Sequence, residues 1–122
     1  MLLRVFKEYF FTASDLNGKM PVLIMGAGDG GVMLLQEIKN NPKINYKPVG
    51  FIDDDVEKHG KIIHGVKVLG SRLDIPQIVK ANGAGKVLIS ILSSQDDQLE
   101  SVYEICKAAN LECQRIRSII EN

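Results

Sequence analysis

The fold is decided by one stretch of sequence, Val22-Leu23-Ile24-Met25-Gly26-Ala27-Gly28-Asp29-Gly30-Gly31. Four apolar residues suited to a buried strand lead directly into the pattern Gly-x-Gly-x-x-Gly, and a segment with helical periodicity follows. A strand, a glycine turn and a helix in this order form the context that a dinucleotide-binding fingerprint needs. The simpler alternative is a glycine-rich turn between a strand and a helix that binds no ligand.

Each glycine of the pattern has its own expected role. Gly26 permits a tight turn out of the strand, and Gly28, which lacks a Cβ, allows a diphosphate to approach the backbone. Gly31 allows the helix to pack closely on the strand. The backbone amides of Asp29 and Gly30 are candidate phosphate donors, because the amino end of a helix attracts anions. The residues expected at this phosphate site are Gly26, Ala27, Gly28, Asp29, Gly30 and Gly31.

A second strand, predicted over residues 48–52, ends in three acidic residues. Asp53 follows Gly31 by about 20 residues, where the fingerprint places an acid that hydrogen-bonds the ribose hydroxyls. Asp54 lies at the same tip and is included in the expected cofactor site, although a solvated turn accounts better for Asp54 and Asp55. No arginine directly follows Asp53, which favours NAD over NADP as the cofactor.

The rest of the chain alternates strands with helices. Strands are predicted at 21–25, 48–52, 66–69, 86–92 and 111–116, and helices at 1–11, 30–40, 73–82 and 95–109. Residues 61–70 form two short extended pieces about His64-Gly65, of which the second is taken as the third strand. Such alternation is typical of a parallel sheet with helices on both faces, and right-handed crossovers favour the strand order 3-2-1-4-5.

We therefore expect an α/β fold, a three-layer Rossmann-like parallel sheet of about five strands with helices on both faces. Ligands of such sheets bind beyond the carboxyl ends of the strands, where the winding reverses. The glycine turn then faces the loop after the fourth strand. The residues expected to wall the other side of the cofactor are Ile91, Leu92 and Ser93.

Composition limits the classes of function. The chain has 15 basic and 15 acidic residues, so its zero net charge argues against a nucleic-acid partner. Its 122 residues fit one domain, which we divide into an amphipathic helix and linker over 1–18 and an NAD(P)-binding domain over 19–122. No apolar run has the length of a membrane span. Cys106 and Cys113 fit no common zinc spacing, and a core of this size needs no disulfide. Two free cysteines are typical of a protein of the reducing cytoplasm.

No catalytic residue or metal site is expected in this chain. Tyr103 and Lys107 match the Tyr-x-x-x-Lys pair of short-chain dehydrogenases and sugar epimerases, and the spacing places both on one helix face. In those enzymes the pair lies much farther from the glycine turn, so an ordinary helix surface is the better interpretation here. His59 and His64 have no cysteine or histidine neighbour at ligand spacing.

Three motifs occur in order and at close spacing: residues 22–31, then Val49-Gly50-Phe51-Ile52-Asp53-Asp54-Asp55, then Ile63-His64-Gly65-Val66-Lys67-Val68-Leu69-Gly70. Together they resemble the N-terminal nucleotide-binding, CoA-binding-type domain of bacterial polysaccharide biosynthesis proteins. That group includes membrane-anchored nucleoside-diphosphate-sugar epimerases and 4,6-dehydratases of capsule and lipopolysaccharide pathways. A related domain precedes some membrane sugar-phosphate transferases. The resemblance covers residues 19–116.

The resemblance implies that parent proteins carry membrane helices before this domain and often a second, complete sugar-nucleotide-modifying domain after it. The Tyr-x-x-x-Lys pair of those enzymes lies in the second domain. Residues 1–11 then link membrane helices to this domain at the cytoplasmic face of the inner membrane; the alternative is a helix packed on its own domain or on a second copy. The family often has a proline where this chain has Leu92-Ser93-Ser94.

The sequence thus predicts the NAD-binding domain of an epimerase or dehydratase that modifies a nucleotide sugar such as a UDP-sugar, without catalysis by this domain alone. One alternative is a regulatory or oligomerising module that binds a nucleotide sugar or coenzyme A. Another is the N-terminal domain of a membrane sugar-phosphate transferase. A third is an interaction module that has kept the fold and lost the ligand.

Overall fold

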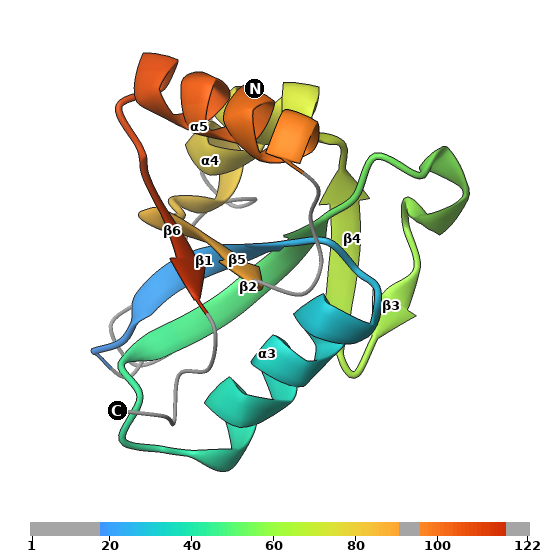
Figure 1. The fold of residues 1–122 in the computed structure, drawn as a ribbon. Coiled ribbons are helices and arrows are strands. Elements are labelled where there is room, and N and C mark those ends of the chain that lie inside the picture. Colours follow the sequence, from blue (N-terminus) through green and yellow to red (C-terminus); the bar gives the residue numbers. More distant parts are fainter. Residues whose placement is uncertain (1–17, 91–95, 117–122) are drawn as a thin grey trace, which may run out of the picture.

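The computed structural model describes residues 18–90 and 96–116 (Figure 1). Its strands are β1 (Met20–Met25), β2 (Tyr46–Ile52), β3 (Ile62–Ile63), β4 (Val66–Gly70), β5 (Lys86–Ser90) and β6 (Glu112–Ile116). Its helices are α3 (Asp29–Asn40), α4 (Ile75–Asn82) and α5 (Asp96–Ala108), with short 3-10 turns η1 (Val56–Lys58) and η2 (Arg72–Asp74). The helix predicted over 1–11 lies outside the described residues.

Within the described residues, the strands form one six-stranded sheet in the order β3-β4-β2-β1-β5-β6. All neighbouring strands are parallel except β3 and β4, which are antiparallel. The predicted order 3-2-1-4-5 is confirmed for the five parallel strands. The predicted number of strands was wrong, because the first of the two extended pieces pairs with the second as the edge strand β3.

The hairpin between β3 and β4 explains the additional strand. Ile63 pairs with Val66, and the two residues between them, His64 and Gly65, both have positive φ angles of 51° and 85°. Two consecutive positive φ values define the tight turn that matches the twist of a two-residue hairpin. The ammonium group of Lys39, on α3, donates to the His64 carbonyl at 2.8 Å and ties the turn to the helix.

Helices cover both faces of the sheet, α3 on one side and α4 with α5 on the other (Figure 1). The side chains of β1 alternate between these two layers, as successive side chains of a strand do. Val22 and Ile24 belong to the core cluster beneath α3, whereas Leu23 and Met25 belong to the cluster beneath α4 and α5. All four are 5% exposed or less, so β1 is buried on both faces, as the central strand of a parallel sheet should be.

Several boundaries differ from the predicted ones for local reasons. β2 begins at Tyr46 and therefore contains Pro48, which has no N–H to donate. The pairing with β1 shifts register at this point, since Val22 pairs with Pro48 and Leu23 with Gly50. The helix predicted over 73–82 is instead the 3-10 turn η2 followed by α4, which ends at Gly83 in the left-handed conformation (φ 73°).

Candidate functional site

The glycine turn joins β1 to α3 at the carboxyl end of the sheet. Gly26 has a φ of 92°, which side-chain-bearing residues rarely adopt, and its N–H donates to the Ile52 carbonyl at 2.6 Å. A Cβ added to Gly31 would lie 1.8 Å from the Gly26 carbonyl oxygen and 3.4 Å from the Ile24 Cγ2. The first turn of α3 is therefore pressed against β1, and both glycines have the turn and packing geometry that the sequence predicted.

Gly28, the N-cap of α3, is in a different situation. A Cβ added there would meet nothing within 4 Å, and no side chain caps the helix. The first backbone bond of the helix runs from the Val32 N–H to the Gly28 carbonyl at 2.9 Å. The amides of Asp29, Gly30 and Gly31 precede it, so the helix itself gives them no acceptor. Within residues 18–90 and 96–116, the site thus combines an uncapped helix start with open space around the Cβ position of Gly28.

Asp53 lies directly after β2 and reaches the glycine turn. Its Oδ2 accepts a hydrogen bond from the Ala27 N–H at 2.8 Å, and its Oδ1 accepts one from the Asp55 N–H at 2.9 Å. The ammonium of Lys58 lies 3.7 Å from Oδ2, and the Asp53 side chain is 15% exposed. Each carboxylate oxygen can accept more than one hydrogen bond, so these contacts leave capacity for a ligand hydroxyl.

The backbone of Asp53 is held as firmly as its side chain. Its N–H donates to the Gly70 carbonyl at 2.9 Å, at the end of β4, and its carbonyl lies 2.7 Å from Nε2 of His59. Asp53 therefore connects the ends of β1, β2 and β4 at the carboxyl edge of the sheet. The structure places the Asp53 carboxylate beside the Ala27 amide, where it fixes the glycine turn, and its predicted contact with a ribose stays a prediction.

Asp54 points to the end of β4 and contacts Arg72, a residue that was not predicted at the site. Its Oδ1 accepts from the Arg72 N–H at 3.2 Å, and its Oδ2 lies 3.5 Å from the Arg72 Nε. Among the described residues, the buried Nη1 of Arg72 has no hydrogen-bond partner. Because β4 is the neighbour of β2, its first following residues meet the tip of β2. The site edge thus holds an arginine, although none follows Asp53 in sequence.

The predicted opposite wall of the site cannot be compared with the structure. β5 ends at Ser90 beside β1, where Met25 pairs with Ile89. Ile91, Leu92 and Ser93 lie outside the described residues, so their role stays a prediction.

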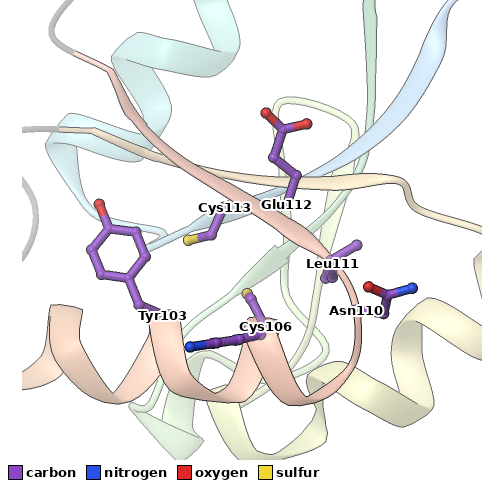
Figure 2. A pocket seen from close by; sticks show the side chains of 7 residues that line it. Tyr103, Cys106, Asn110, Leu111, Glu112 and Cys113 are labelled. Atoms are coloured by element: carbon purple, nitrogen blue, oxygen red, sulfur yellow. The ribbon is translucent and has the colours of Figure 1, made fainter.

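Tyr103 and Lys107 are far from the glycine turn. They line an open pocket of about 570 Å³ between α5 and the beginning of β6, together with Glu112 and Cys113 (Figure 2). That is the amino end of the parallel strands, whereas the glycine turn lies at the carboxyl end. This separation favours the interpretation of the pair as helix surface.

No group of three or more histidine, cysteine, aspartate or glutamate side chains in 18–90 and 96–116 is arranged to hold a metal ion. No helix in this part of the chain is both long and apolar enough to cross a membrane.

The parallel sheet, the glycine turn and the acid after β2 define a Rossmann-like domain of the nucleotide- or CoA-binding class. A family model described as a CoA-binding domain matches residues 2–116, and the chain belongs to that family.

Two relatives of this chain are proteins of polysaccharide biosynthesis. The capsular polysaccharide biosynthesis protein CapD of Staphylococcus aureus is 32% identical over 117 residues, which are 95% of this chain and 19% of that protein. The probable polysaccharide biosynthesis protein EpsC of Bacillus subtilis (strain 168) is 33% identical over 84 residues, 69% of this chain and 14% of that protein. The chain thus spans less than one fifth of each relative, and it is related to a region of proteins of polysaccharide biosynthesis.

Solved structures share the fold. The crystal structure of UDP-D-quinovosamine 4-dehydrogenase from Vibrio fischeri matches with a TM-score of 0.72 and 26% identity, covering 83% of this chain and 80% of that one. RSP, a Rex-family repressor whose structure is known in complex with NADH, matches with a TM-score of 0.66, covering 88% of this chain and 50% of that one. At 15% identity, the repressor shows the likeness of the fold alone.

Proposed function

We propose that this domain binds the diphosphate of NAD at the amino end of α3, as part of a system that modifies nucleoside-diphosphate sugars for a bacterial polysaccharide. The observation that carries the proposal is the helix start at Gly28, which no side chain of the described residues caps and beside which they leave open space at the Cβ position. Free amides at the positive end of a helix favour a phosphate group over water.

The neighbouring residues supply the second half of the site. The Asp53 carboxylate lies against the glycine turn, held by the Ala27 amide, and faces the position expected for the adenosine ribose. Its remaining acceptor capacity suits the two ribose hydroxyls. The domain holds the adenosine half of the cofactor and contributes no acid or base to a reaction. Any redox chemistry then belongs to another part of a larger protein, at the cytoplasmic side of the membrane.

A specific observation favours a second candidate, a ligand with a phosphate on its adenosine ribose, such as coenzyme A or NADP. Among residues 18–90 and 96–116, the buried Nη1 of Arg72 finds no hydrogen-bond partner, and the Lys58 ammonium lies 3.7 Å from the Asp53 carboxylate. Both cations border the acids at the ribose side of the site. Guanidinium groups bind phosphate through several N–H donors, so Arg72 is the residue that would discriminate such a ligand from NAD.

Isothermal titration of the chain with NAD, NADP, coenzyme A and UDP-sugars tests the proposal. NAD binding with weaker NADP and coenzyme A supports the first candidate. The reverse order, abolished by Arg72→Gln, supports the second candidate. Binding of UDP-sugars alone supports a nucleotide-sugar module, and no binding at all contradicts every ligand-binding interpretation.

Gly28→Ala locates the ligand. The added Cβ meets no protein atom, so the fold should persist, while the methyl group occupies the space of the diphosphate. NAD affinity should fall about tenfold or more, which corresponds to about 1.4 kcal/mol. Gly85→Ala is the matched control, because its Cβ makes only ordinary contacts of 3.5–3.9 Å with Met20 at the opposite end of the sheet. Equal affinities of the two variants would place the ligand elsewhere.

A further inference from the structure

Two free cysteines face each other between α5 and β6, outside the site just described. Cys106, on the last turn of α5, is 1% exposed, whereas Cys113, the second residue of β6, is half-buried. Figure 2 shows both sulfur atoms in the space between the helix and the strand. Cys113 packs against the core cluster that contains Cys106.

The end of α5 sets this arrangement. The Leu111 N–H donates to the Cys106 carbonyl at 2.8 Å, and the Asn110 N–H donates to the Lys107 carbonyl at 3.0 Å. Asn110 has a φ of 59°. These two bonds around a left-handed residue form the Schellman ending of a helix. The chain therefore reverses directly onto the turn of the helix that carries Cys106.

The alternation of side chains along β6 then brings the second sulfur to the same place. Leu111 and Cys113 are two residues apart, so their side chains lie on one face of the extended segment. Both pack against the cluster beneath α5, while the carboxylate of Glu112 lies 3.7 Å from the ammonium of Lys86. The closeness of the two thiols is thus a property of the helix ending and the strand.

The two thiols also affect each other's ionisation. The hydrogen bond between them lowers the pKa of Cys106, and the same bond together with burial raises the pKa of Cys113. A thiolate next to a thiol is the arrangement that thiol–disulfide exchange requires.

A small reagent can reach the pair from solvent. Cys106 and Cys113 both line the open pocket of about 570 Å³, with Tyr103 and Lys107 at its side. Cys113 is the more exposed of the two thiols.

We propose that Cys106 and Cys113 are a reversible modification site, at which a low-molecular-weight disulfide oxidises the pair to an intramolecular disulfide. One cysteine thiolate attacks the reagent's S–S bond, forms a mixed disulfide and releases one reagent thiolate. The other cysteine loses its proton to water, attacks the protein sulfur of the mixed disulfide and releases the second reagent thiolate. The two cysteines are oxidised by two electrons, and the reagent disulfide is reduced to two thiols. The proposal does not depend on nucleotide binding.

Mass spectrometry of the whole chain tests this site. After treatment with glutathione disulfide and alkylation of the remaining thiols, the chain should carry no alkyl group and should be lighter by two hydrogen atoms than the reduced chain. Dithiothreitol should restore two alkylation sites. Cys113→Ser and Cys106→Ser should each yield no intramolecular disulfide. A stable glutathione adduct on the native chain, a disulfide-linked dimer, or two thiols still open to alkylation would overturn the proposal.

Comparing the rate of disulfide formation in the native chain with that in the unfolded chain tests the proposal without the cysteine variants, whose folding could be impaired. The native chain should form its internal disulfide faster than the same chain in urea at equal glutathione disulfide, because the fold holds the two sulfurs together. Equal or slower formation in the native chain would mean that the fold does not prepare the pair, which contradicts the proposal.

Discussion

The two ends of the parallel sheet use their polar groups in opposite ways. At the amino end, the ammonium of Lys86 donates to the Tyr46 hydroxyl at 2.9 Å and to the Gln114 amide oxygen at 3.2 Å, and lies 3.7 Å from the Glu112 carboxylate. The Lys86 side chain is only 12% exposed. Side chains from three strands thus satisfy one another at this end of the sheet.

At the carboxyl end, the polar groups are positioned but not all satisfied by the protein. The start of α3 has no side-chain cap, and within the described residues Arg72 keeps a buried nitrogen without a partner. Asp53 is held by backbone amides that leave it further acceptor capacity. The difference teaches that the polar groups at the amino end of the sheet stabilise the fold. At the carboxyl end, the start of α3 and Asp53 keep hydrogen-bonding capacity that we expect a ligand to use. Substitution of a polar group at the amino end should therefore lower stability without changing binding, whereas substitution at the carboxyl end can lower both.

Gly31→Ala should have the largest effect on stability. The new Cβ would lie 1.8 Å from a backbone oxygen, so α3 would have to move away from β1. We expect the free energy of unfolding to fall by about 3 kcal/mol, at the upper end for overpacking. Urea denaturation measures this loss, and Gly28→Ala, which adds the same methyl group in open space, should stay within about 1 kcal/mol of the wild type. A small loss for Gly31→Ala would show that the close contact is not essential.

Asp53→Ala should reduce both stability and binding. It removes the acceptor of the Ala27 and Asp55 amides, and unmet hydrogen bonds at a largely buried position cost about 1–3 kcal/mol. The affinity for NAD should fall about tenfold or more. Urea denaturation and calorimetric titration give the two values. If Asp53→Ala lowered stability but left the NAD affinity unchanged, Asp53 would hold the glycine turn and would not contact the ligand.

Lys86→Met should lower stability without changing binding. It removes the hydrogen bonds to Tyr46 and Gln114, for a loss of about 1–2 kcal/mol in the free energy of unfolding. Lys80→Met, on the exposed side of α4, is the matched control and should stay within about 0.5 kcal/mol. A marked loss of NAD affinity in Lys86→Met would contradict the separation of the two ends.

The smallest expected effect is the pH dependence of the stability that Lys86 contributes at the amino end of the sheet. The hydrogen bond to the Tyr46 hydroxyl raises the pKa of Lys86 above its ordinary 10.5, more than burial lowers it. Its contribution to stability is therefore complete below pH 10.5 and is lost as the pH rises through the raised pKa. The difference in unfolding free energy between wild type and Lys86→Met should narrow in this range. If the difference in unfolding free energy instead widened as the pH rises, the pKa of Lys86 would be lowered rather than raised by folding, contrary to this prediction.

The parallel core and the glycine turn could be predicted because local signals specify them. The apolar run of β1, the glycines after it and the alternation of elements all indicate the same fold, and the handedness of crossovers orders the strands. Asp53 could be placed because the fingerprint has a fixed spacing.

Contacts between residues on neighbouring strands could not be predicted from such local signals. Arg72 reaches Asp54 only because β4 lies next to β2, and nothing local to either residue indicates it. The strand β3 has two residues and exists through its pairing with β4, so its apolar pattern was too short to count. The bond from Ala27 to Asp53 likewise joins two segments that meet only in the folded sheet.

The hairpin at β3 has a consequence for how molecules of this chain behave toward one another. A long, regular strand at the border of a sheet offers its free N–H and C=O groups to strands of other molecules, and aggregates grow in this way. Here the border strand has two residues and runs against the direction of the sheet, Lys61 precedes it, and Lys67 on β4 pairs with its first residue. A foreign strand finds few groups to pair with and meets positive charge, so this side of the sheet discourages edge-to-edge aggregation at high protein concentration.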